Sequence, residues 1–247
     1  MSALKLKDKR IVITGGSKGL GRALADRFAE EGARLALCAR SYDDLNRVAL
    51  GLAVHGHAPL YAACDIADAE QVTRFSELVL SEFGAVDVLV NNASMLGPRI
   101  VIADWTRSTW ERVIDVNVHG AFAVTRAVLP SMIRQRAGSI INVTSSVGKK
   151  GRARWGAYAV SKFALEGFTQ TLADEVRCHG IRVNSVNPGA LDTDMRHAAY
   201  PDEDRAALKK PSEITDVFVF LASDRSRGTT GESFDAQEYL RTNKEIA

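Results

Sequence analysis

Short apolar runs alternate with amphipathic stretches along most of the chain. The first run, residues 10–14, ends in a glycine-rich turn, and the next stretch places Leu20, Leu24 and Phe28 on one face of a helix. Each apolar run is almost continuous, which is typical of parallel strands buried on both faces. The pattern therefore predicts an α/β fold, a doubly wound parallel sheet with helices on both faces.

The pattern also predicts where the elements lie. The predicted strands span residues 10–14, 33–38, 58–64, 86–90, 139–144, 181–186 and 232–235. The predicted helices span residues 20–31, 43–52, 68–83, 108–136, 158–179 and 212–222. We expect Asp68 and Ser212 to cap helices, Pro130 to bend the long fourth helix, and residues 236–247 to form a polar tail.

Composition narrows the class of protein. The chain has 247 residues, 46% of them hydrophobic, and a net charge of +2, so we expect one domain over residues 1–247 and no dedicated nucleic-acid surface. No apolar run reaches about 18 residues, which argues against a membrane span. The three cysteines are scattered without metal-ligand spacing, which predicts no metal site, reduced thiols and a cytoplasmic location.

The turn after the first strand reads Thr-Gly-Gly-Ser-Lys-Gly-Leu-Gly. Glycines let the main chain approach a pyrophosphate, and the N-terminus of the following helix offers amide donors. The glycine spacing differs from G-x-G-x-x-G, and an ordinary tight turn is the alternative. Because a strand precedes the turn and a helix follows it, we expect a nucleotide to bind at Gly15, Ser17, Lys18, Gly19, Leu20 and Gly21.

The end of the second predicted strand bears on the choice between NAD and NADP. An acid there binds the adenosine ribose, whereas a cation accepts a 2′-phosphate. Here Arg40 and Ser41 follow the strand, no acid occurs before Asp43, and Lys18 adds a second cation. We therefore expect NADP (NADPH) to be preferred over NAD, with a solvated Arg40 as the alternative.

Two further strand ends carry candidate cofactor contacts. Asp65 and Ile66 can border an adenine ring, although Asp65 can equally cap a helix. Asn91, Asn92 and Ala93 can contact a cofactor or simply satisfy a turn. In parallel sheets ligands bind at the carboxyl ends of strands, and these motifs all fall at such ends.

Tyr158 and Lys162 stand one helical turn apart. An ammonium near a phenol lowers the phenol pKa, and a hydroxyl at Ser145 can hold a substrate oxygen at the same point. Asn117, between two valines of a predicted helix, faces either the core or a cleft. Alone, Tyr-x-x-x-Lys is a weak signal, and a surface helix is the alternative.

Taken in order, these motifs resemble the short-chain dehydrogenase/reductase family over residues 8–235. The resemblance implies a single-domain Rossmann-like fold and a tetrad of Asn117, Ser145, Tyr158 and Lys162. Tyr158 is then the general acid/base, Lys162 lowers its pKa and bonds the nicotinamide ribose, Ser145 polarises the substrate oxygen, and Asn117 holds a water. The residues implied to line the nicotinamide are Pro188, Gly189, Leu191 and Thr193.

The chain departs from the family pattern at two places. Ser94 stands where the family usually has glycine, and residues 233–238 replace the usual end of the last strand, which puts the closing of the site by the tail in doubt. Ser145 rather than Ser146 matches the family serine because Gly148 stands three residues after it.

The resulting hypothesis is an oxidoreductase that transfers a hydride between NADP(H) and a small carbonyl or secondary alcohol, in one version a 3-oxoacyl reductase. The alternatives are a nucleotide-sensing protein without turnover and a dehydratase or epimerase. We expect a substrate loop at residues 190–211 and association through the two long helices into a dimer or tetramer. The cations at Lys149, Lys150, Arg152 and Arg154 favour an anionic substrate or mark a solvated loop.

Overall fold

A single sheet organises the part of the chain that the structure, a computed structural model, describes, which is residues 4–244. Within these residues seven strands are hydrogen-bonded in the order β3-β2-β1-β4-β5-β6-β7, and each neighbouring pair is parallel. The strands are β1 (Arg10–Thr14), β2 (Arg34–Ala39), β3 (Leu60–Ala63), β4 (Val88–Asn91), β5 (Gly138–Val143), β6 (Ile181–Asn187) and β7 (Ser233–Asp235). The predicted doubly wound sheet is confirmed.

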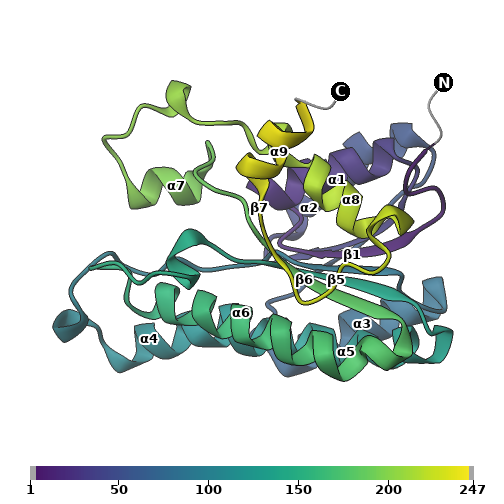
Figure 1. Cartoon of the computed structure of the whole chain (residues 1–247), viewed down its shortest axis with the longest axis horizontal. Helices are drawn as coiled ribbons and strands as arrows, with labels where there is room; N and C mark the ends of the chain where they lie inside the picture. Colours follow the sequence, from purple (N-terminus) through teal and green to yellow (C-terminus); the bar gives the residue numbers. More distant parts are fainter. Residues whose placement is uncertain (1–3, 245–247) are drawn as a thin grey trace.

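Helices cover both faces of the sheet (Figure 1). The helices are α1 (Gly19–Glu30), α2 (Tyr42–Leu52), α3 (Ala69–Phe83), α4 (Arg107–Ile114), α5 (Gly120–Gln135), α6 (Gly156–Val176), α7 (Asp194–Ala199), α8 (Asp216–Ala222) and α9 (Ala236–Lys244). One face carries α1, α2 and α8, and the opposite face carries α3, α5 and α6. No helix within the described residues is long and apolar enough to cross a bilayer.

Burial of both sheet faces explains why the apolar runs are continuous. In β1, Ile11 and Ile13 belong to the core beneath α1 and α8, whereas Val12 belongs to the core beneath α3, α5 and α6. All three side chains are fully buried. A run without polar alternation is therefore what this central strand requires.

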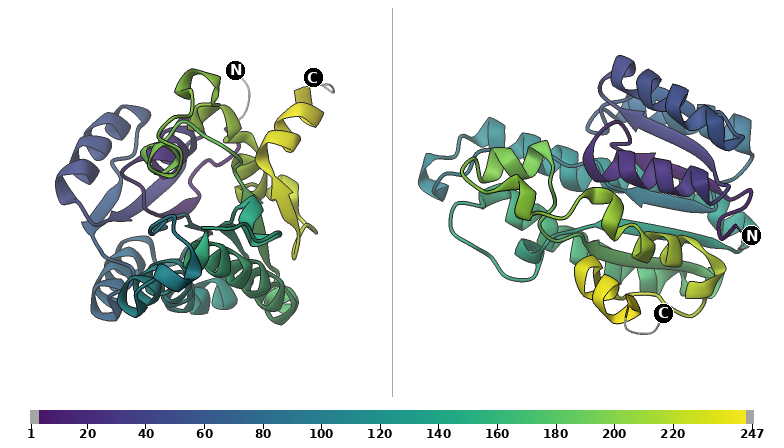
Figure 2. Two further views of the ribbon diagram at one scale, coloured as in Figure 1. Left: turned by 90° about the vertical axis from the view of Figure 1, so that its left-hand side faces the viewer. Right: turned by 90° about the horizontal axis from the view of Figure 1, so that it is seen from above.

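The order of the strands places a crevice beside β1. The chain winds outward through β2 and β3 on one side and through β4 to β7 on the other. The turns that leave neighbouring strands diverge at this reversal, which makes room for a ligand at the carboxyl ends. Figure 2 shows the segment that carries α7 on the α1 side of this sheet end, across from the loops that follow β4 and β5.

The predicted helix 108–136 is interrupted at Asn117. It forms α4, a π-helical turn (Asp115–His119) and α5, and Pro130 lies inside α5. The Asn117 side chain is buried and bonds to the loop after β4 on one side and to α6 on the other. A π-turn adds a residue to one helical turn, which allows the helix to present that side chain.

Two predictions for the C-terminal part were wrong. Ser212 caps no helix, because it lies within a 3₁₀ turn (Pro211–Ile214) that precedes α8. Residues 236–244 form α9 instead of a polar tail, and residues 245–247 lie outside the described residues. Ala236 is buried, and Tyr239 and Leu240 pack against the core, so the few apolar residues of this segment anchor it.

We expect Gly21→Ala to destabilise the protein, because a Cβ at Gly21 would lie 2.1 Å from the Gly15 carbonyl oxygen. Overpacking of this kind costs about 1–3 kcal/mol. Gly51 lies in α2, and a Cβ there would make only an ordinary contact of 3.5 Å with Arg22 Nη2, so Gly51→Ala is the matched control and should stabilise by about 0.4–1 kcal/mol. Denaturant unfolding measures both, and a Gly21→Ala variant as stable as wild type would contradict the close packing.

Candidate active site

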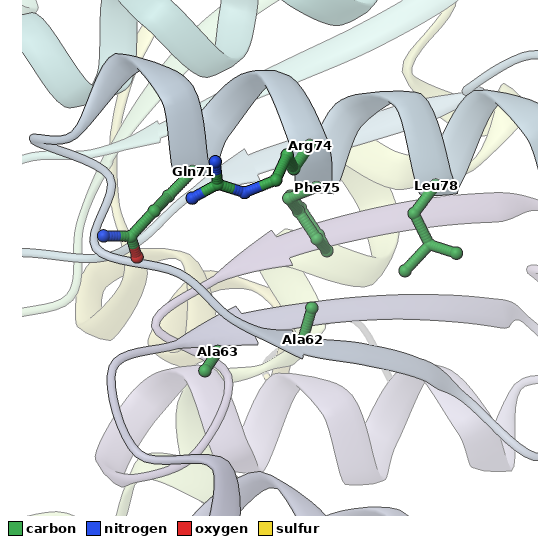
Figure 3. A pocket seen from close by; sticks show the side chains of 6 residues that line it. All are labelled: Ala62, Ala63, Gln71, Arg74, Phe75 and Leu78. Atoms are coloured by element: carbon green, nitrogen blue, oxygen red, sulfur yellow. The ribbon is translucent and has the colours of Figure 1, made fainter.

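A cavity of about 880 Å³ lies at the carboxyl ends of the strands. Its lining includes every residue predicted for the catalytic and cofactor sites except Gly21, Asn91 and Asn117. A smaller hollow of about 300 Å³ lies between β3 and α3 and contains none of the predicted site residues (Figure 3). The predicted residues, which are far apart in sequence, therefore gather at one place.

The glycine loop brings the main chain to the cavity without side chains in the way. Gly15 and Gly19 have φ angles of +67° and +53°, a region that favours glycine. The N-cap of α1 is Lys18, whose side chain makes no capping hydrogen bond within the described residues, whereas Ser41 and Asp68 cap α2 and α3. The first amides of α1 are therefore available to an anion.

Asn92 ties the end of β4 to this glycine loop. Its Nδ2 donates to the carbonyl oxygens of Thr14 (2.9 Å) and Gly15 (3.2 Å). Thr14 Oγ1 accepts from the main-chain amides of Asn92 and Ala93, each at 3.0 Å. These bonds fix the distance between the two sides of the crevice.

The neighbouring Asn91 has a different orientation. Its Nδ2 donates to Thr125 Oγ1 and to Asn142 Oδ1, both at 2.9 Å, inside the core between β4, β5 and α5. Its side chain therefore does not face the cavity, and a cofactor contact from Asn91 stays a prediction that involves its main chain. Sequence reasoning had no signal to separate the two asparagines, because both sides of a strand end accept polar residues.

The end of β2 combines three charges at the cavity. Arg40 is exposed and forms no ion pair among the described residues, whereas Lys18 Nζ lies 3.0 Å from a carboxylate oxygen of Asp44. The hydrogen bond from Lys18 holds the pKa of Asp44 below its ordinary value. The sequence reading missed Asp44, which lies in the first turn of α2 and lines the cavity.

The loop after β3 shows that Asp65 is not a helix cap. Asp68 caps α3 by accepting from Glu70 and Gln71 amides at 3.0 and 3.1 Å. Asp65 instead accepts from the Ala67 amide at 3.1 Å and pairs with Arg112 of α4. The alternative interpretation of Asp65 as a cap is therefore wrong, and its carboxylate borders the cavity with both oxygens engaged.

Tyr158 and Lys162 lie on the buried side of α6. Their side chains are 8% and 1% exposed, and Lys162 Nζ lies 5.4 Å from the centre of the Tyr158 ring. Nζ donates to the Val143 carbonyl at 2.8 Å, at the end of β5, and Ser145 follows that strand. The helix and the strand end thus bring a phenol, an ammonium and a hydroxyl to one wall of the cavity.

Burial dominates the ionisation of this pair. It raises the pKa of Tyr158 to about 12, opposed by a hydrogen bond with Ser145, and it lowers the pKa of Lys162 to about 7, opposed by the charge of Glu166. The expected lowering of the Tyr158 pKa is absent, because desolvation of the phenolate outweighs the hydrogen bond with Ser145. At neutral pH Tyr158 is therefore protonated and able to donate.

Asn117 acts here through its side chain. Its Oδ1 accepts from the Met95 amide at 2.7 Å and from Ser94 Oγ at 3.2 Å, and its Nδ2 donates to Met95 O and Ser161 Oγ, both at 2.9 Å. Ser161 in turn donates to the Tyr158 carbonyl at 2.7 Å. Ser94 stands where the family usually has glycine, and its hydroxyl thus adds one polar contact to the hydrogen bonds of Asn117.

A column of stacked side chains includes Trp155, Tyr158 and Arg196, which line the cavity. Trp155 packs on Tyr158 with ring centres 5.5 Å apart. The Arg99 guanidinium lies over the rings of Trp155 (4.7 Å) and Tyr200 (4.3 Å), and Arg196 lies over Tyr200 at 4.0 Å. The column joins the loop after β4 to the α7 segment, and the contacts of Arg99 with Trp155 and Tyr200 have no local sequence signal because the three residues are far apart in the chain.

The fold is a doubly wound α/β sheet, and its cavity lies at the carboxyl ends of the strands and includes the glycine turn after β1. The family model for short chain dehydrogenases matches residues 9–204, and the chain belongs to the NAD(P)-dependent short-chain dehydrogenase/reductase family. The cavity thus belongs to a dehydrogenase/reductase.

Relatives and solved structures resemble the chain over nearly its whole length. The uncharacterized oxidoreductase YciK of Escherichia coli is 38% identical, with 94% of this chain and 93% of YciK covered. The 3-oxoacyl-[acyl-carrier-protein] reductase FabG of Thermotoga maritima is 37% identical, with 93% of this chain and 96% of FabG covered. A short chain dehydrogenase of Shigella flexneri, solved with NADP, superposes with a TM-score of 0.92 at 37% identity, covering 96% of this chain and all of that one.

We expect Lys162→Met to stabilise the protein most at low pH. The pKa of Lys162 falls from 10.5 to about 7 on folding, so between these values the unfolded chain binds more protons and wild-type stability rises with pH. The variant lacks this titration. Its stability advantage over wild type should therefore be largest below pH 7 and shrink as pH rises toward 10.

Denaturant unfolding at pH 6, 7.5 and 9 measures this difference. Lys149, an exposed lysine, supplies the control, and Lys149→Met should show no such trend. A Lys162→Met difference that does not change with pH would contradict the burial of an ionisable ammonium at this position.

Proposed function

We propose that the chain transfers a hydride between NADP(H) and a carbonyl or secondary alcohol, with Tyr158 as the general acid/base. The observation that carries this proposal is the convergence of Tyr158, Lys162 and Ser145 on one cavity that also reaches the uncapped N-terminus of α1. A proton donor at one end and an anion-binding turn at the other suit a dinucleotide that reaches a substrate.

The cradle fits the cofactor at both ends. The positive φ angles of Gly15 and Gly19, and the free amides of α1, suit a pyrophosphate, and the turn at Pro188 and Gly189 lines the same cavity as Tyr158. When bound, the nicotinamide supplies or accepts the hydride. The NADP found in the solved Shigella flexneri relative supports the same occupant here.

The chain's own residues supply the proton chemistry. In reduction, the Ser145 hydroxyl donates to the substrate carbonyl oxygen and orients it. Tyr158, protonated at neutral pH, gives its proton to that oxygen as charge develops there. Lys162 is held at the end of β5 and stabilises the phenolate that remains. In oxidation the same groups act in reverse.

Asn117 has a supporting role in this scheme. The resemblance assigns it a bound water, and its side chain is already engaged with Met95 and Ser161. We infer that Asn117 holds the π-turn and the loop after β4 against α6, so that any water it binds lies at its main chain. This keeps the loop at a fixed distance from Tyr158.

The charges at the end of β2 support a preference for NADP. Arg40 is free of carboxylate partners among residues 4–244 and lines the cavity, so its guanidinium is available to a 2′-phosphate. Lys18 is paired with Asp44 and can turn from it to the phosphate. Asp44 weakens this preference, because its carboxylate repels the same phosphate.

The substrate proposal is a 3-oxoacyl compound or a similar small ketone. FabG relatives share about this chain's full length, and the exposed cations at Lys149, Lys150, Arg152 and Arg154 flank Trp155 without ion pairs among the described residues. Stoichiometric consumption of NADPH separates this reductase from a dehydratase or epimerase on the same scaffold, and turnover separates it from a nucleotide sensor.

We also propose that the chain is one domain, acts in the cytoplasm and associates through α5 and α6. Phe122, Val160 and Phe163 are 51%, 47% and 44% exposed on these helices, which suits a contact with a second copy. The three cysteines, all within the described residues, are free thiols, which suits a reducing compartment.

Tyr158→Phe should abolish ketone reduction while leaving the fold and NADPH binding intact. Removal of the hydroxyl eliminates the proton donor, so we expect a loss in kcat of about 10²–10⁴-fold. NADPH oxidation with a panel of ketones measures the loss, and NADPH fluorescence measures binding. Unchanged turnover in Tyr158→Phe would refute the proposed acid.

Ser145 and Ser146 provide a matched pair for the same assay. Ser145 lines the cavity beside Tyr158, whereas Ser146 is exposed and lies outside the lining. Ser145→Ala should lower kcat, and Ser146→Ala should retain wild-type kinetics. The reverse result would move the substrate oxygen to the second serine.

Arg40→Ala should raise the KM for NADPH about tenfold and leave the KM for NADH unchanged. A charge-assisted bond to a phosphate contributes about 1.5–3 kcal/mol, and a tenfold change corresponds to about 1.4 kcal/mol. Arg47→Ala is the control, because Arg47 pairs with Asp44 and does not line the cavity. Equal effects of Arg40→Ala on both cofactors would exclude recognition of the 2′-phosphate.

A further inference from the structure

The segment after β6 is held by residues that come from the end of the chain. This segment begins at Pro188 and Gly189, which line the same cavity as Tyr158. Gln237 bonds to this segment and Asp235 bonds to Asn187, the last residue of β6, and both lie where the chain departs from the family pattern. We call Asp235 and Gln237 the C-terminal clamp.

We propose that the C-terminal clamp positions the turn at Pro188 and Gly189 for the nicotinamide half of the cofactor. The proposal rests on the proposed function, because that function places the nicotinamide at this turn. Asp235 and Gln237 do not line the cavity, so they act through the turn and are positioning residues.

Gln237 bonds directly to the main chain of the turn. Its Nε2 donates to the Ala190 carbonyl at 2.9 Å and approaches the Pro188 carbonyl at 3.4 Å. Gly189 has a φ of +76°, and a Cβ at that position would lie 2.5 Å from Gln237 Nε2. The Gln237 amide therefore occupies the space that a side chain at position 189 would need.

Asp235 holds both Gln237 and the strand that enters the turn. One carboxylate oxygen accepts from the amides of Gln237 and Glu238, both at 3.0 Å, and so caps the start of α9. The other accepts from Asn187 Nδ2 at 2.8 Å, and Asn187 Oδ1 accepts from the Gly189 amide at 3.1 Å. The chain of bonds runs without a gap from α9 to Gly189.

Aromatic packing makes this clamp rigid. Tyr239 lies with its ring centre 5.8 Å from that of Phe220 in α8 and 6.5 Å from that of Phe234 in β7. Ala236 is buried, and β7 pairs with β6 through Asn187 and Asp235. Because α9 packs on the core, the hydrogen bonds of Gln237 hold the turn in a fixed position relative to the core.

Loss of the C-terminal clamp should affect only the nicotinamide half of the cofactor. The glycine loop and the end of β2, which face the adenosine half, have no hydrogen bond to Asp235 or Gln237 among the described residues. Loss of the Gln237 donor leaves two main-chain carbonyls of the turn unpaired and frees the turn to move. Binding of the nicotinamide half should weaken, and binding of the adenosine half should not.

The test compares two ligands by fluorescence and calorimetric titration. NADPH carries both halves, and 2′,5′-ADP carries the adenosine and its 2′-phosphate without the nicotinamide. Gln237→Met keeps the length of the side chain and removes the donor, and Gln237→Glu keeps its shape and exchanges the donor for an acceptor. Glu238→Gln, at an exposed neighbouring position, is the matched control.

We expect both Gln237 variants to raise the Kd for NADPH about tenfold and to leave the Kd for 2′,5′-ADP within about twofold, with Glu238→Gln equal to wild type. Intact 2′,5′-ADP binding also shows that the variants are folded. An unchanged NADPH Kd, or an equal loss for both ligands, would overturn the clamp alone. A wild-type protein that binds neither ligand would overturn the proposed function instead.

Discussion

The burial of one ammonium is the constraint on which the site depends. Lys162 is 1% exposed, forms no ion pair among residues 4–244, and donates to the Val143 carbonyl. A buried cation without a carboxylate costs free energy, so the fold must hold it by packing. Gly148 shows how closely, because a Cβ there would lie 2.8 Å from the Lys162 carbonyl oxygen. Such an unfavourable arrangement is expected where the ionisation of the group serves a reaction.

Three amide side chains from different elements hold the main chain around that ammonium. Asn92 bonds to the glycine loop, Asn117 to the loop after β4, and Gln237 to the turn after β6. An amide offers a donor and an acceptor and does not ionise near neutral pH. The hydrogen bonds that these amides form therefore do not depend on the protonation state of Lys162 or of its neighbour Tyr158.

The sequence was sufficient for the sheet and for most of the cavity, because both follow from local patterns. Continuous apolar runs such as residues 10–14 predict buried parallel strands, and motifs at strand ends must then meet at one edge. Tertiary contacts determine the features of the site that the sequence did not predict. Asn91 and Asn92 are adjacent in sequence, and only the folded structure shows that their side chains point to opposite sides of the end of β4. Asp44 lies at the site because it pairs with Lys18. The pKa of Tyr158 depends on its burial, which the spacing of residues in the sequence does not indicate.

Different kinds of atoms form the two ends of the cavity. For this reason the substrate is harder to predict from the sequence than the cofactor. At the adenosine end, glycines and free amides of α1 present main-chain atoms, whose placement follows from a short motif. At the end where the proposed function places the substrate, Trp155 lines the cavity and stacks with Arg99 and Tyr200, which lie outside the lining, so that three loops assemble this region. Changes in those loops alter this region without moving Tyr158 or Lys162. On the proposed function, changes in these loops would therefore alter the choice of substrate and leave Tyr158 and the glycine turn in place.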